Sequence, residues 1–519
     1  MEKFQNLIPL DFTIQENYNK QIEALDKIKP LFGKEYPNII GGKEYKTVKK
    51  TVSINPANTT EVVATFQKSG VEHSEIAMQA ALTTFETWSR TTPEYRAEFL
   101  FKAAEIIRQR RFEINAWMIS EVGKNFAEAD GDTCEAVDFL EFYGREALRY
   151  AQKQELTRMA GEDNNYFYIP LGVGIVIPPW NFPFAILVGM TAASIVSGNT
   201  VVLKPSSESP MMGWLFNEIM REIELPDGVI NFLVASGAEA GDYLVDHAKT
   251  RYVSFTGSME VGIRIYERAS KVNPGQIWLK RVVAEMGGKD AILVDNELHS
   301  LEDAVDGVLA AAFGFQGQKC SACSRAIIHT DVYDEFLEIL KTKIGKFTVG
   351  LPSSNAPMGP VVSEKAYKSI LNYIEIGKSE GRLIAGGDVA KVDGVDGYYI
   401  QPTVIADLAP KSRLAQEEVF GPVLAITKCD SFEDGINIFN GTIYGLTGSL
   451  YTSNKEKLER GARELHCGNL YLNRKSTGAY VDVHPFGGFN MSGTDSKAGS
   501  RDYLLLFMQG KTVTEKIIG

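Results

Sequence analysis

The segment Tyr252-Val-Ser-Phe-Thr-Gly-Ser-Met-Glu-Val-Gly262 joins an apolar strand to an amphipathic helix through a Gly-Ser turn. A turn of this kind places backbone N–H groups and the positive end of a helix where a pyrophosphate can bind. It is not the complete G-x-G-x-x-G pattern, and Gly172-Val-Gly174 precedes its own strand instead of following it. Taken alone, the segment is barely more typical of a nucleotide site than of an ordinary tight turn.

The chain around this turn alternates between strands and helices. The predicted strands are Val173–Pro178, Thr200–Lys204, Val229–Val234, Tyr252–Thr256 and Val282–Ala284, with helices at about 184–197, 208–223, 238–247 and 259–271. This alternation predicts right-handed βαβ units around a parallel, Rossmann-like sheet. A second series follows at Ala291–Asp295, Ala326–His329, Val361, Leu383–Ala385, Val404, Leu424–Thr427 and Ser449–Tyr451. The predicted fold class is α/β, with at least two domains in 519 residues.

The flanking segments carry weaker patterns. Residues 1 to about 50 are expected to form an arm of short helices, and Thr51–Pro56 a strand. Helical apolar spacing covers Ser74–Trp88, Pro93–Gly123 and Phe126–Tyr150. We expect a two-stranded excursion at Gln154–Tyr168, turned at Gly161, and a late strand in the tail Leu504–Ile518.

Cys320 is the strongest candidate for a catalytic residue. It lies in Phe313-Gly-Phe-Gln-Gly-Gln-Lys-Cys-Ser-Ala-Cys-Ser-Arg325, where an apolar helix runs into a glycine-containing turn. Upstream, Glu285 ends the apolar run Val282-Val-Ala284. A thiol on a turn and a carboxylate at a strand end are suited to covalent attack on a carbonyl followed by hydrolysis. Because a free thiol has a pKa of about 8.5, it needs local help, which Lys319 could supply.

Cys320 and Cys323 also form a C-x-x-C unit, which leaves a redox or metal pair and an inert turn cysteine as alternatives. The other cysteines, Cys134, Cys429 and Cys467, are scattered along the chain. The six histidines form no cluster with ligand spacing. We therefore expect a nucleophilic thiol and no metal site.

The composition argues against several classes of protein. The net charge is −12, and no run of five or more Lys or Arg offers a footprint for nucleic acid or a membrane surface. The longest apolar stretch, Phe182 to Val196, is interrupted by Pro183 and Gly189 and is shorter than the roughly 18 residues of a membrane span. The start lacks a signal-peptide pattern and the 5 cysteines are odd in number, so we expect reduced thiols and a cytoplasmic protein.

Two predicted strand ends carry polar side chains. Asn181 follows Val173–Pro178, at the edge where α/β sheets bind ligands, and its amide could donate to a developing oxyanion or simply cap the next helix. Lys204 ends the next strand and could hydrogen-bond ribose hydroxyls or extend into solvent. Neither residue decides the function by itself.

Six motifs together resemble the aldehyde dehydrogenase superfamily and occur in family order. They are Pro179-Trp-Asn-Phe-Pro183, Lys204-Pro-Ser206, Phe255-Thr-Gly-Ser-x-x-x-Gly262, Glu285-Met-Gly-Gly-Lys289, Gly317-Gln-Lys-Cys320 and Glu417-Glu-Val-Phe-Gly-Pro422. The resemblance implies a Rossmann-type cofactor domain at residues 1–147 and 169–286 and an α/β catalytic domain at 287–497. It also implies a β oligomerisation flap and tail at 148–168 and 498–519.

The resemblance implies roles for single residues. Cys320 would be the nucleophile and Glu285 the general base, and the Asn181 side chain would share an oxyanion hole with the Cys320 N–H. NAD would be the cofactor, held by Ile177, Pro178, Pro179, Trp180, Lys204, Ser206, Ser207, Gly237, Gly241, Phe255, Thr256, Gly257, Ser258, Met286, Gly287, Glu418 and Phe420.

Within the superfamily, Gln318-Lys-Cys-Ser-Ala-Cys-Ser-Arg325, Arg474-Lys-Ser-Thr-Gly-Ala-Tyr-Val481 and His484-Pro-Phe-Gly-Gly-Phe489 resemble the 1-pyrroline-5-carboxylate dehydrogenases. These enzymes oxidise L-glutamate γ-semialdehyde to glutamate in the second step of proline degradation. The resemblance implies a carboxylate grip, an aromatic pair along the chain and an acidic residue facing the substrate. The residues concerned are Gly478, Ala479, Ser321 and Lys319 for the grip, Phe182 and Phe486 for the pair, and Glu128 for the acid. Because no proline-oxidising domain precedes these motifs, the stand-alone form is expected.

One departure concerns the choice of cofactor. Many NAD-specific relatives have a glutamate three residues after the lysine of Lys-Pro-Ser, on the adenosine ribose. Here that position is Ser207, and the acid falls one residue later, at Glu208. Since no carboxylate at this position repels a 2′-phosphate, we expect NADP to be used beside a preferred NAD.

Three other functions stay open from the sequence. They are a same-fold dehydrogenase for another small carboxylated semialdehyde, a coenzyme A-acylating relative, and a non-enzymatic scaffold. The family resemblance also implies a homo-oligomer built on dimers, in which the flap of one subunit extends the catalytic sheet of its neighbour.

Overall fold

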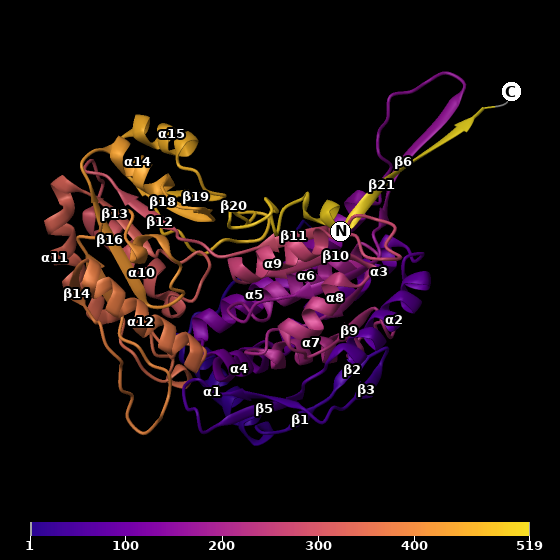
Figure 1. The fold of residues 1–519 in the computed structure, drawn as a ribbon, viewed down its shortest axis with the longest axis horizontal. Coiled ribbons are helices and arrows are strands. Elements are labelled where there is room, and N and C mark those ends of the chain that lie inside the picture. The colour runs from indigo at the N-terminus through magenta and orange to yellow at the C-terminus, as the bar shows by residue number, and fades with distance from the viewer. Residues whose placement is uncertain (1–2, 518–519) are drawn as a thin grey trace.

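The computed structural model describes residues 3–517 and contains two large sheets and a projecting ribbon (Figure 1). Each large sheet has seven strands. The first takes its strands from residues 38–285 and the second from residues 291–472, so each series predicted from the sequence builds one sheet. The α/β fold class is confirmed.

The first sheet has the order β11-β10-β7-β8-β9-β2-β3, and its first five strands run parallel. These strands are β7 (Val173–Ile177), β8 (Thr200–Leu203), β9 (Ile230–Phe232), β10 (Thr250–Thr256) and β11 (Arg281–Glu285), connected by α6 (Ala185–Val196), α7 (Pro210–Glu222) and α9 (Met259–Ser270). Parallel strands covered by helices have no solvent face, which explains their continuous apolar runs. Their carboxyl ends meet at one edge, and the loops that leave this edge carry the predicted cofactor residues.

The helix predicted at 238–247 is wrong in part. Residues Gly237–Gly241 form a π-helical turn, and only α8 (Asp242–Asp246) is regular. The helical spacing over Pro93–Gly123 belongs to two helices, α3 (Pro93–Gln109) and α4 (Arg111–Val122), which meet at Arg110. The predicted helices α2 (Val71–Trp88) and α5 (Phe126–Tyr150) are confirmed.

The amino-terminal arm is not a series of short helices. It holds one long helix, α1 (Gln15–Ile28), a short 3₁₀ turn, and three short strands. The strands β2 (Asn38–Ile40) and β3 (Lys43–Tyr45) extend the first sheet beyond β9, while β1 (Glu35–Tyr36), β5 (Val62–Gln67) and β4 (Lys50–Ile54) form a small separate sheet. Strands of two or three residues are too short for their periodicity to be seen in the sequence.

The second sheet has the order β14-β15-β16-β13-β12-β18-β19. Its strands are β12 (Ala291–Val294), β13 (Arg325–His329), β14 (Arg382–Ala385), β15 (Thr403–Ala406), β16 (Val423–Cys429), β18 (Thr447–Tyr451) and β19 (Asn469–Leu472). The helices of this half are α10 (Leu301–Phe313), α11 (Tyr333–Lys343), α12 (Glu364–Glu380), α13 (Arg413–Gln416), α14 (Phe432–Asn440) and α15 (Lys455–Glu464). The strand predicted at Val361 is wrong, because this residue lies in a loop and donates its N–H to Tyr398 O at 2.8 Å.

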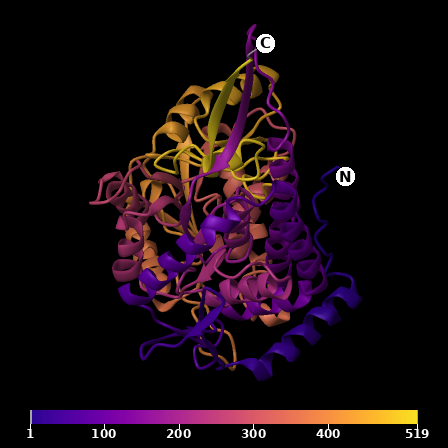
Figure 2. The same cartoon turned by 90° about the vertical axis from the view of Figure 1, so that its right-hand side faces the viewer.

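The ribbon projects from the body of the molecule in both ribbon views (Figure 1, Figure 2). It pairs β6 (Glu162–Pro170) with the tail strand β21 (Met508–Lys516) over nine residues in antiparallel register. The tail strand is therefore confirmed, although Ile518 lies outside the described residues. The excursion at Gln154–Tyr168 is not a hairpin: only its second half is a strand, and the partner of that strand comes from the other end of the chain.

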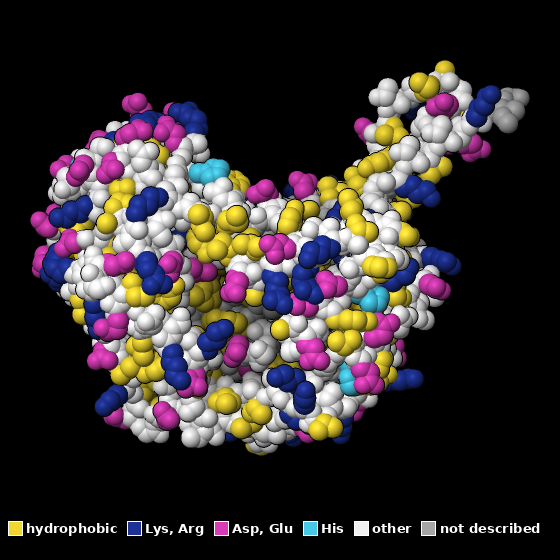
Figure 3. All heavy atoms as spheres, viewed as in Figure 1, with side chains coloured by type: hydrophobic (Ala, Val, Ile, Leu, Met, Phe, Trp, Pro, Cys, Tyr) yellow, Lys and Arg dark blue, Asp and Glu magenta, His cyan; other side chains and the backbone are white. Residues whose placement is uncertain are grey.

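Charged side chains of both signs are scattered over the face seen in Figure 3, and the hollow between the two halves is lined by apolar side chains. Within residues 3–517, no helix is long and apolar enough to cross a membrane.

Candidate active site

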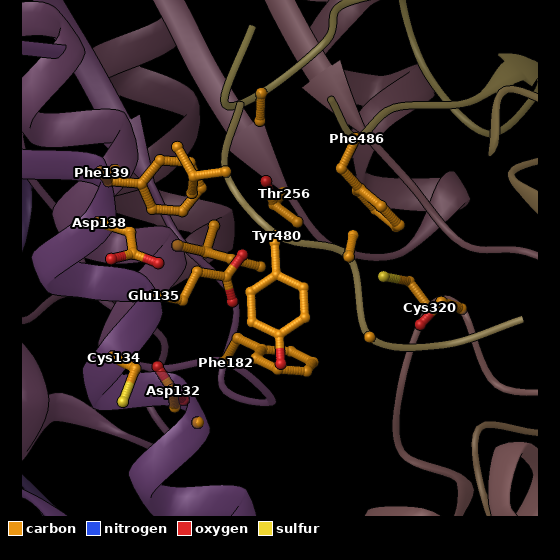
Figure 4. Close-up of a pocket in the computed structure, with 18 of the residues that line it drawn as sticks. Asp132, Cys134, Glu135, Asp138, Phe139, Phe182, Thr256, Cys320, Tyr480 and Phe486 are labelled. Atoms are coloured by element: carbon orange, nitrogen blue, oxygen red, sulfur yellow. The ribbon is translucent and has the colours of Figure 1, made fainter. Parts of the chain in front are cut away.

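A cavity of about 290 Å³ brings together loops from both large sheets (Figure 4). It lies between α5, the loop after β7, the turn after α10 and the segment before β20 (Phe489–Asn490). Eleven residues of the predicted site line it, namely Glu128, Phe182, Thr256, Glu285, Met286, Lys319, Cys320, Ser321, Gly478, Ala479 and Phe486. Figure 4 shows Cys320 on one wall and Glu135 reaching from α5 on the opposite side, with Phe182, Tyr480 and Phe486 between them.

A strained turn presents Cys320. After α10, Phe315 and Gln316 adopt φ angles of 48° and 54°, a left-handed conformation that costs energy for residues other than glycine. The buried Gln316 amide stabilises the turn by donating to Pro360 O at 2.8 Å. Burial, and then the nearby Asp290, Glu418 and Glu285 carboxylates, raise the pKa of the Cys320 thiol well above its usual range. This environment therefore favours the protonated thiol of Cys320 over the thiolate.

The Asn181 side chain lies beside this turn. It is 5% exposed, and its Nδ2 donates to Gln318 O at 3.2 Å, two residues before Cys320. The Cys320 N–H has no hydrogen-bond partner among the described residues. The structure thus places an amide donor from the first sheet against the turn of the second, as the strand-end position of Asn181 predicted.

Glu285 ends β11 and lies in an apolar, crowded position. Its Oε1 accepts a hydrogen bond from the Ser496 hydroxyl, while its Oε2 is buried without a partner among residues 3–517. Burial raises the pKa of Glu285 to about 8, although the hydrogen bond from Ser496 opposes this shift. The carboxyl can therefore exchange a proton close to neutral pH, which suits a general base. Ser496 gave no signal in the sequence, because only the fold brings it to Glu285.

The loop after β19 offers two unpaired backbone donors to the cavity. The N–H groups of Gly478 and Ala479 have no hydrogen-bond partner in the described part of the chain, and Gly478 has a φ of 85° that favours glycine. Arg474 Nη2 donates to Thr477 O at 2.8 Å and to Gly478 O at 3.2 Å, which turns these carbonyls away from the cavity. Consecutive N–H groups left free in this way form an anion-binding concavity.

Two acidic residues of α5, Glu128 and Glu135, line the cavity near this loop. Glu128 forms an ion pair with Lys319, with 2.7 Å between Oε1 and Nζ. Although burial opposes it, the charges of Lys319 and Lys124 lower the pKa of Glu128. Glu135 lies about two helical turns after Glu128 on α5 and lines the same cavity. It makes no ion pair or hydrogen bond within residues 3–517. Burial and Asp132 raise the pKa of Glu135 to about 8. Sequence reasoning missed Glu135, because α5 carries many acidic residues and the pattern does not say which one faces a ligand.

The remaining predicted residues lie at the carboxyl edge of the first sheet and beside it. Three of them end strands, namely Ile177, Phe255 and Thr256. The segments directly after strands contain Pro178, Pro179, Trp180, Ser206 and Ser207, and the turns contain Gly237, Gly241, Gly257, Ser258, Met286 and Gly287. Ser258 caps α9 by accepting from Val261 N at 3.4 Å. Because Thr256 and Met286 also line the cavity, this edge adjoins the thiol.

Three features of this edge fit a dinucleotide. Lys204 is 7% exposed with only Pro205 O within reach of its Nζ, at 3.5 Å, and burial lowers its pKa to about 8. The Ser236 hydroxyl is buried without a partner among the described residues, next to Gly237, where an added Cβ would meet nothing within 4 Å. Glu418 accepts from Gly288 N at 2.9 Å, and the Phe420 ring packs edge-on against Trp180 with 5.5 Å between centroids. The buried Lys204 and Ser236 donors lack a good acceptor within the described residues, and a diphosphate or ribose hydroxyl group could supply one.

The alternative uses of the cysteines receive no support from the geometry. Cys323 is buried and directs its Sγ to Arg325 O at 3.2 Å, and all five cysteines are free. Among residues 3–517, no group of three or more His, Cys, Asp or Glu side chains could hold a metal ion.

The fold and the cavity define an α/β protein with a thiol and a carboxyl beside a Rossmann-type sheet edge. Comparison with known proteins identifies its family. Residues 44–513 match the model of the aldehyde dehydrogenase family, so the chain belongs to this family. It is 55% identical to a 1-pyrroline-5-carboxylate dehydrogenase of Geobacillus kaustophilus, over 97% of this chain and 98% of that protein.

Solved structures agree with this result. A 1-pyrroline-5-carboxylate dehydrogenase from Thermus with bound NAD is 46% identical over the whole of both chains, with a TM-score of 0.97. A betaine aldehyde dehydrogenase from Staphylococcus aureus in complex with NAD+ is 27% identical, with a TM-score of 0.88, over 96% of this chain and 97% of that one. The predicted family is therefore confirmed.

Proposed function

We propose that this protein oxidises L-glutamate γ-semialdehyde, which is in equilibrium with 1-pyrroline-5-carboxylate, to L-glutamate with NAD+, in the second step of proline degradation. The observation that carries the proposal is a single cavity that holds the Cys320 thiol, the free N–H groups of Gly478 and Ala479, and the unpaired Glu135 carboxyl. An aldehyde that bears an α-carboxylate and an α-ammonium matches these three groups. The similarity to 1-pyrroline-5-carboxylate dehydrogenases of Geobacillus and Thermus supports the same substrate.

The substrate would lie with its carboxylate on the Gly478 and Ala479 N–H groups and the Ser321 hydroxyl. Phe182 and Phe486 would flank its methylene chain, since both rings line the cavity beside Cys320. Lys319 would contribute positive charge while it stays paired with Glu128. Glu135, and not Glu128, would face the ammonium, because Glu128 already has a cationic partner.

The chemistry would begin at Cys320. Its sulfur bonds to the aldehyde carbon, its proton passes to a base, and the Asn181 amide and the Cys320 N–H stabilise the oxyanion of the thiohemiacetal. Bound NAD+ supplies the acceptor for the hydride that leaves the carbon. Glu285 then removes a proton from water, which attacks the resulting thioester, and glutamate and the free thiol are released.

The edge of the first sheet would hold NAD+. Lys204 and Glu418 would hydrogen-bond the ribose hydroxyls, Gly257 and Ser258 would meet the diphosphate, and Phe420 would lie against the nicotinamide ribose. Ser207 is exposed, and burial raises the pKa of its neighbour Glu208. We therefore propose that NADP+ is accepted as well, at a lower efficiency.

One assay tests both parts of the proposal. The absorbance of the reduced nicotinamide should be followed with three substrates, glutamate γ-semialdehyde, succinate semialdehyde and propionaldehyde. Each substrate should be assayed with NAD+ and with NADP+. We expect kcat/KM to be highest for glutamate γ-semialdehyde with NAD+. A higher value for succinate semialdehyde would favour the alternative, a dehydrogenase of the same mechanism for another small carboxylated semialdehyde. A requirement for coenzyme A would indicate an acylating enzyme.

The projecting ribbon supports an oligomer built on dimers. The ribbon has only two strands, and its Phe167 and Val513 are 41% exposed each, so it lacks a covering layer. We propose that it extends the sheet of a second copy at the free edge of β19. Light scattering on the intact chain and on a chain ending at Lys511 should separate a dimer-based assembly from a monomer.

The two large sheets and the projecting ribbon also support the proposed division of the chain. The cofactor domain would comprise residues 1–147 and 169–286, the catalytic domain 287–497, and the flap and tail 148–168 and 498–519. Because all five cysteines are free, we propose that the enzyme works in the reducing cytoplasm.

A further inference from the structure

The first described residues of the chain run past the substrate cavity. Figure 2 shows the amino-terminal segment as an extended strand of chain outside the helices that include α5. Pro9 contributes to the lining of the cavity, together with Tyr480 and Val481 from the loop after β19. Two distant parts of the sequence therefore meet at this wall of the proposed substrate site.

Asn6 joins these two parts directly. Its side-chain amide carries two hydrogens, and each has a different acceptor: Nδ2 donates to Asp138 Oδ2 at 2.9 Å and to Val481 O at 3.0 Å. Asp138 belongs to α5, and Val481 lies two residues after Ala479. One side chain thus bridges the helix that carries Glu135 and the loop that carries the free N–H groups.

The segment around Asn6 is held along its length. Leu7 N donates to Asp138 Oδ1 at 2.7 Å, Leu10 N donates to Asp130 Oδ2 at 2.7 Å, and Arg111 donates to Ile8 O at 3.0 Å. The Phe4 ring also packs on Phe142 of α5, with 5.3 Å between centroids. Because these contacts seat the backbone on α5, the Asn6 amide is presented to Val481 without a further loss of freedom.

Other contacts also hold this loop. Arg474 holds the carbonyls of Thr477 and Gly478, and His484 accepts from Tyr480 N at 3.2 Å, since burial lowers the pKa of His484 and leaves it neutral. These contacts come from within the loop itself and its flanks. Beyond them, Asp482 N donates to Gly499 O at 2.9 Å, and Gly499 N donates to Tyr143 Oη of α5 at 2.8 Å. Asn6 adds the side-chain hydrogen bond that ties the Val481 carbonyl itself to the amino-terminal segment and, through Asp138, to α5.

We propose that Asn6 is a positioning residue for substrate recognition. By holding Val481 it sets the distance between the Gly478 and Ala479 N–H groups, which bind the α-carboxylate, and Glu135, which faces the α-ammonium. The inference rests on the proposed function for its substrate. It assigns a role in specificity to a residue that touches neither the thiol nor the cofactor edge.

Asn6→Ala tests the proposal, with Asn17→Ala as the matched control. Asn17 lies on the same arm, but its Nδ2 donates to Asp11 O at 2.9 Å, on the exposed side and away from the loop. Losing the bridge should raise KM for glutamate γ-semialdehyde about fivefold or more, the factor of one lost hydrogen bond, with kcat within twofold. KM for propionaldehyde, which has neither a carboxylate nor an ammonium, should stay the same. Asn6→Gln, which keeps both hydrogens, should recover part of the loss.

Hydrogen exchange separates this inference from the proposed function. The hydrogen-bonded amides of Tyr480 and Asp482 should exchange faster in Asn6→Ala than in the wild-type protein or in Asn17→Ala, whichever aldehyde is the substrate. Unchanged exchange, or an equal rise of KM for both aldehydes, would overturn the role of Asn6. Failure of the wild-type enzyme to oxidise glutamate γ-semialdehyde would overturn the proposed function and leave the exchange result to decide whether the bridge exists.

Discussion

The two ends of the cavity are built in opposite ways. At the thiol end, Cys320 is partly buried and Glu285 is buried, and one oxygen of Glu285 has no partner among the described residues. At the anchor end, the loop bearing Gly478 and Ala479 is braced by Arg474, by His484 and, from the other end of the chain, by Asn6.

This difference shows how the site divides its tasks. Burial without partners destabilises charge, so the thiol and the carboxyl at the reactive end keep their protons close to neutral pH and can exchange them during the reaction. An anchor needs fixed geometry instead, because a carboxylate is bound tightly only by donors that are already in place. Substitutions at the reactive end should therefore act on turnover, and those at the anchor end on KM.

The largest effect is expected from Cys320→Ala. Without the thiol no covalent intermediate forms, so aldehyde oxidation should fall by at least about a thousandfold, while NAD+ binding measured by calorimetry stays close to the wild-type value. Cys323→Ala is the control, since Cys323 is buried with its Sγ directed to Arg325 O and does not line the described cavity, and it should keep nearly full activity. A comparable loss in both variants would instead support a C-x-x-C pair.

Glu285→Gln should come next. Hydride transfer precedes deacylation, so a burst of reduced cofactor should survive in a single turnover while steady-state kcat falls about a hundredfold or more. Rapid mixing with absorbance detection measures both phases. Loss of the burst in proportion to turnover would place Glu285 earlier, in the activation of the thiol.

Substitutions at the anchor end should change KM and leave kcat close to the wild-type value. Glu135→Gln should raise KM for glutamate γ-semialdehyde about tenfold, because a neutral amide binds the ammonium less well than a carboxylate, with kcat close to wild type. Glu128→Gln should change KM less than about threefold, since Glu128 is occupied by Lys319. The reverse ranking would make Glu128 the acidic residue that faces the substrate, as the family resemblance implies.

The smallest expected effect is a shift in the pH profile. Since the pKa of Glu285 is raised to about 8, kcat limited by deacylation should increase as the pH rises through about 8 and the carboxyl loses its proton. The hydrogen bond from Ser496 lowers this pKa, so Ser496→Ala should move the profile to higher pH, and Ser496→Thr, which keeps the hydroxyl, should not. An unmoved profile in Ser496→Ala would mean that another group titrates.

Much of the fold could be predicted from local patterns. The helices Phe126–Tyr150 and Ser74–Trp88 and the parallel strands of both series have long or strongly apolar signatures. The pairing of Glu162–Pro170 with Met508–Lys516 could not be predicted, because a strand reveals its faces in the sequence but not its partner. The π-helical turn at Gly237–Gly241 was mistaken for a helix, because its composition suits both.

The sequence by itself determined the family and the class of chemistry and predicted Cys320 as the nucleophile, because Cys320, Glu285 and Asn181 each stand in a local motif whose order along the chain is informative. Only the tertiary structure decided which carboxyl is free to meet a substrate and which residues brace the anchor. Ser496 and Asn6 hydrogen-bond partners that are far away in the chain, and Glu135 faces a cavity whose other walls come from distant segments. Contacts of this kind arise from packing, and no local pattern of residue types encodes them.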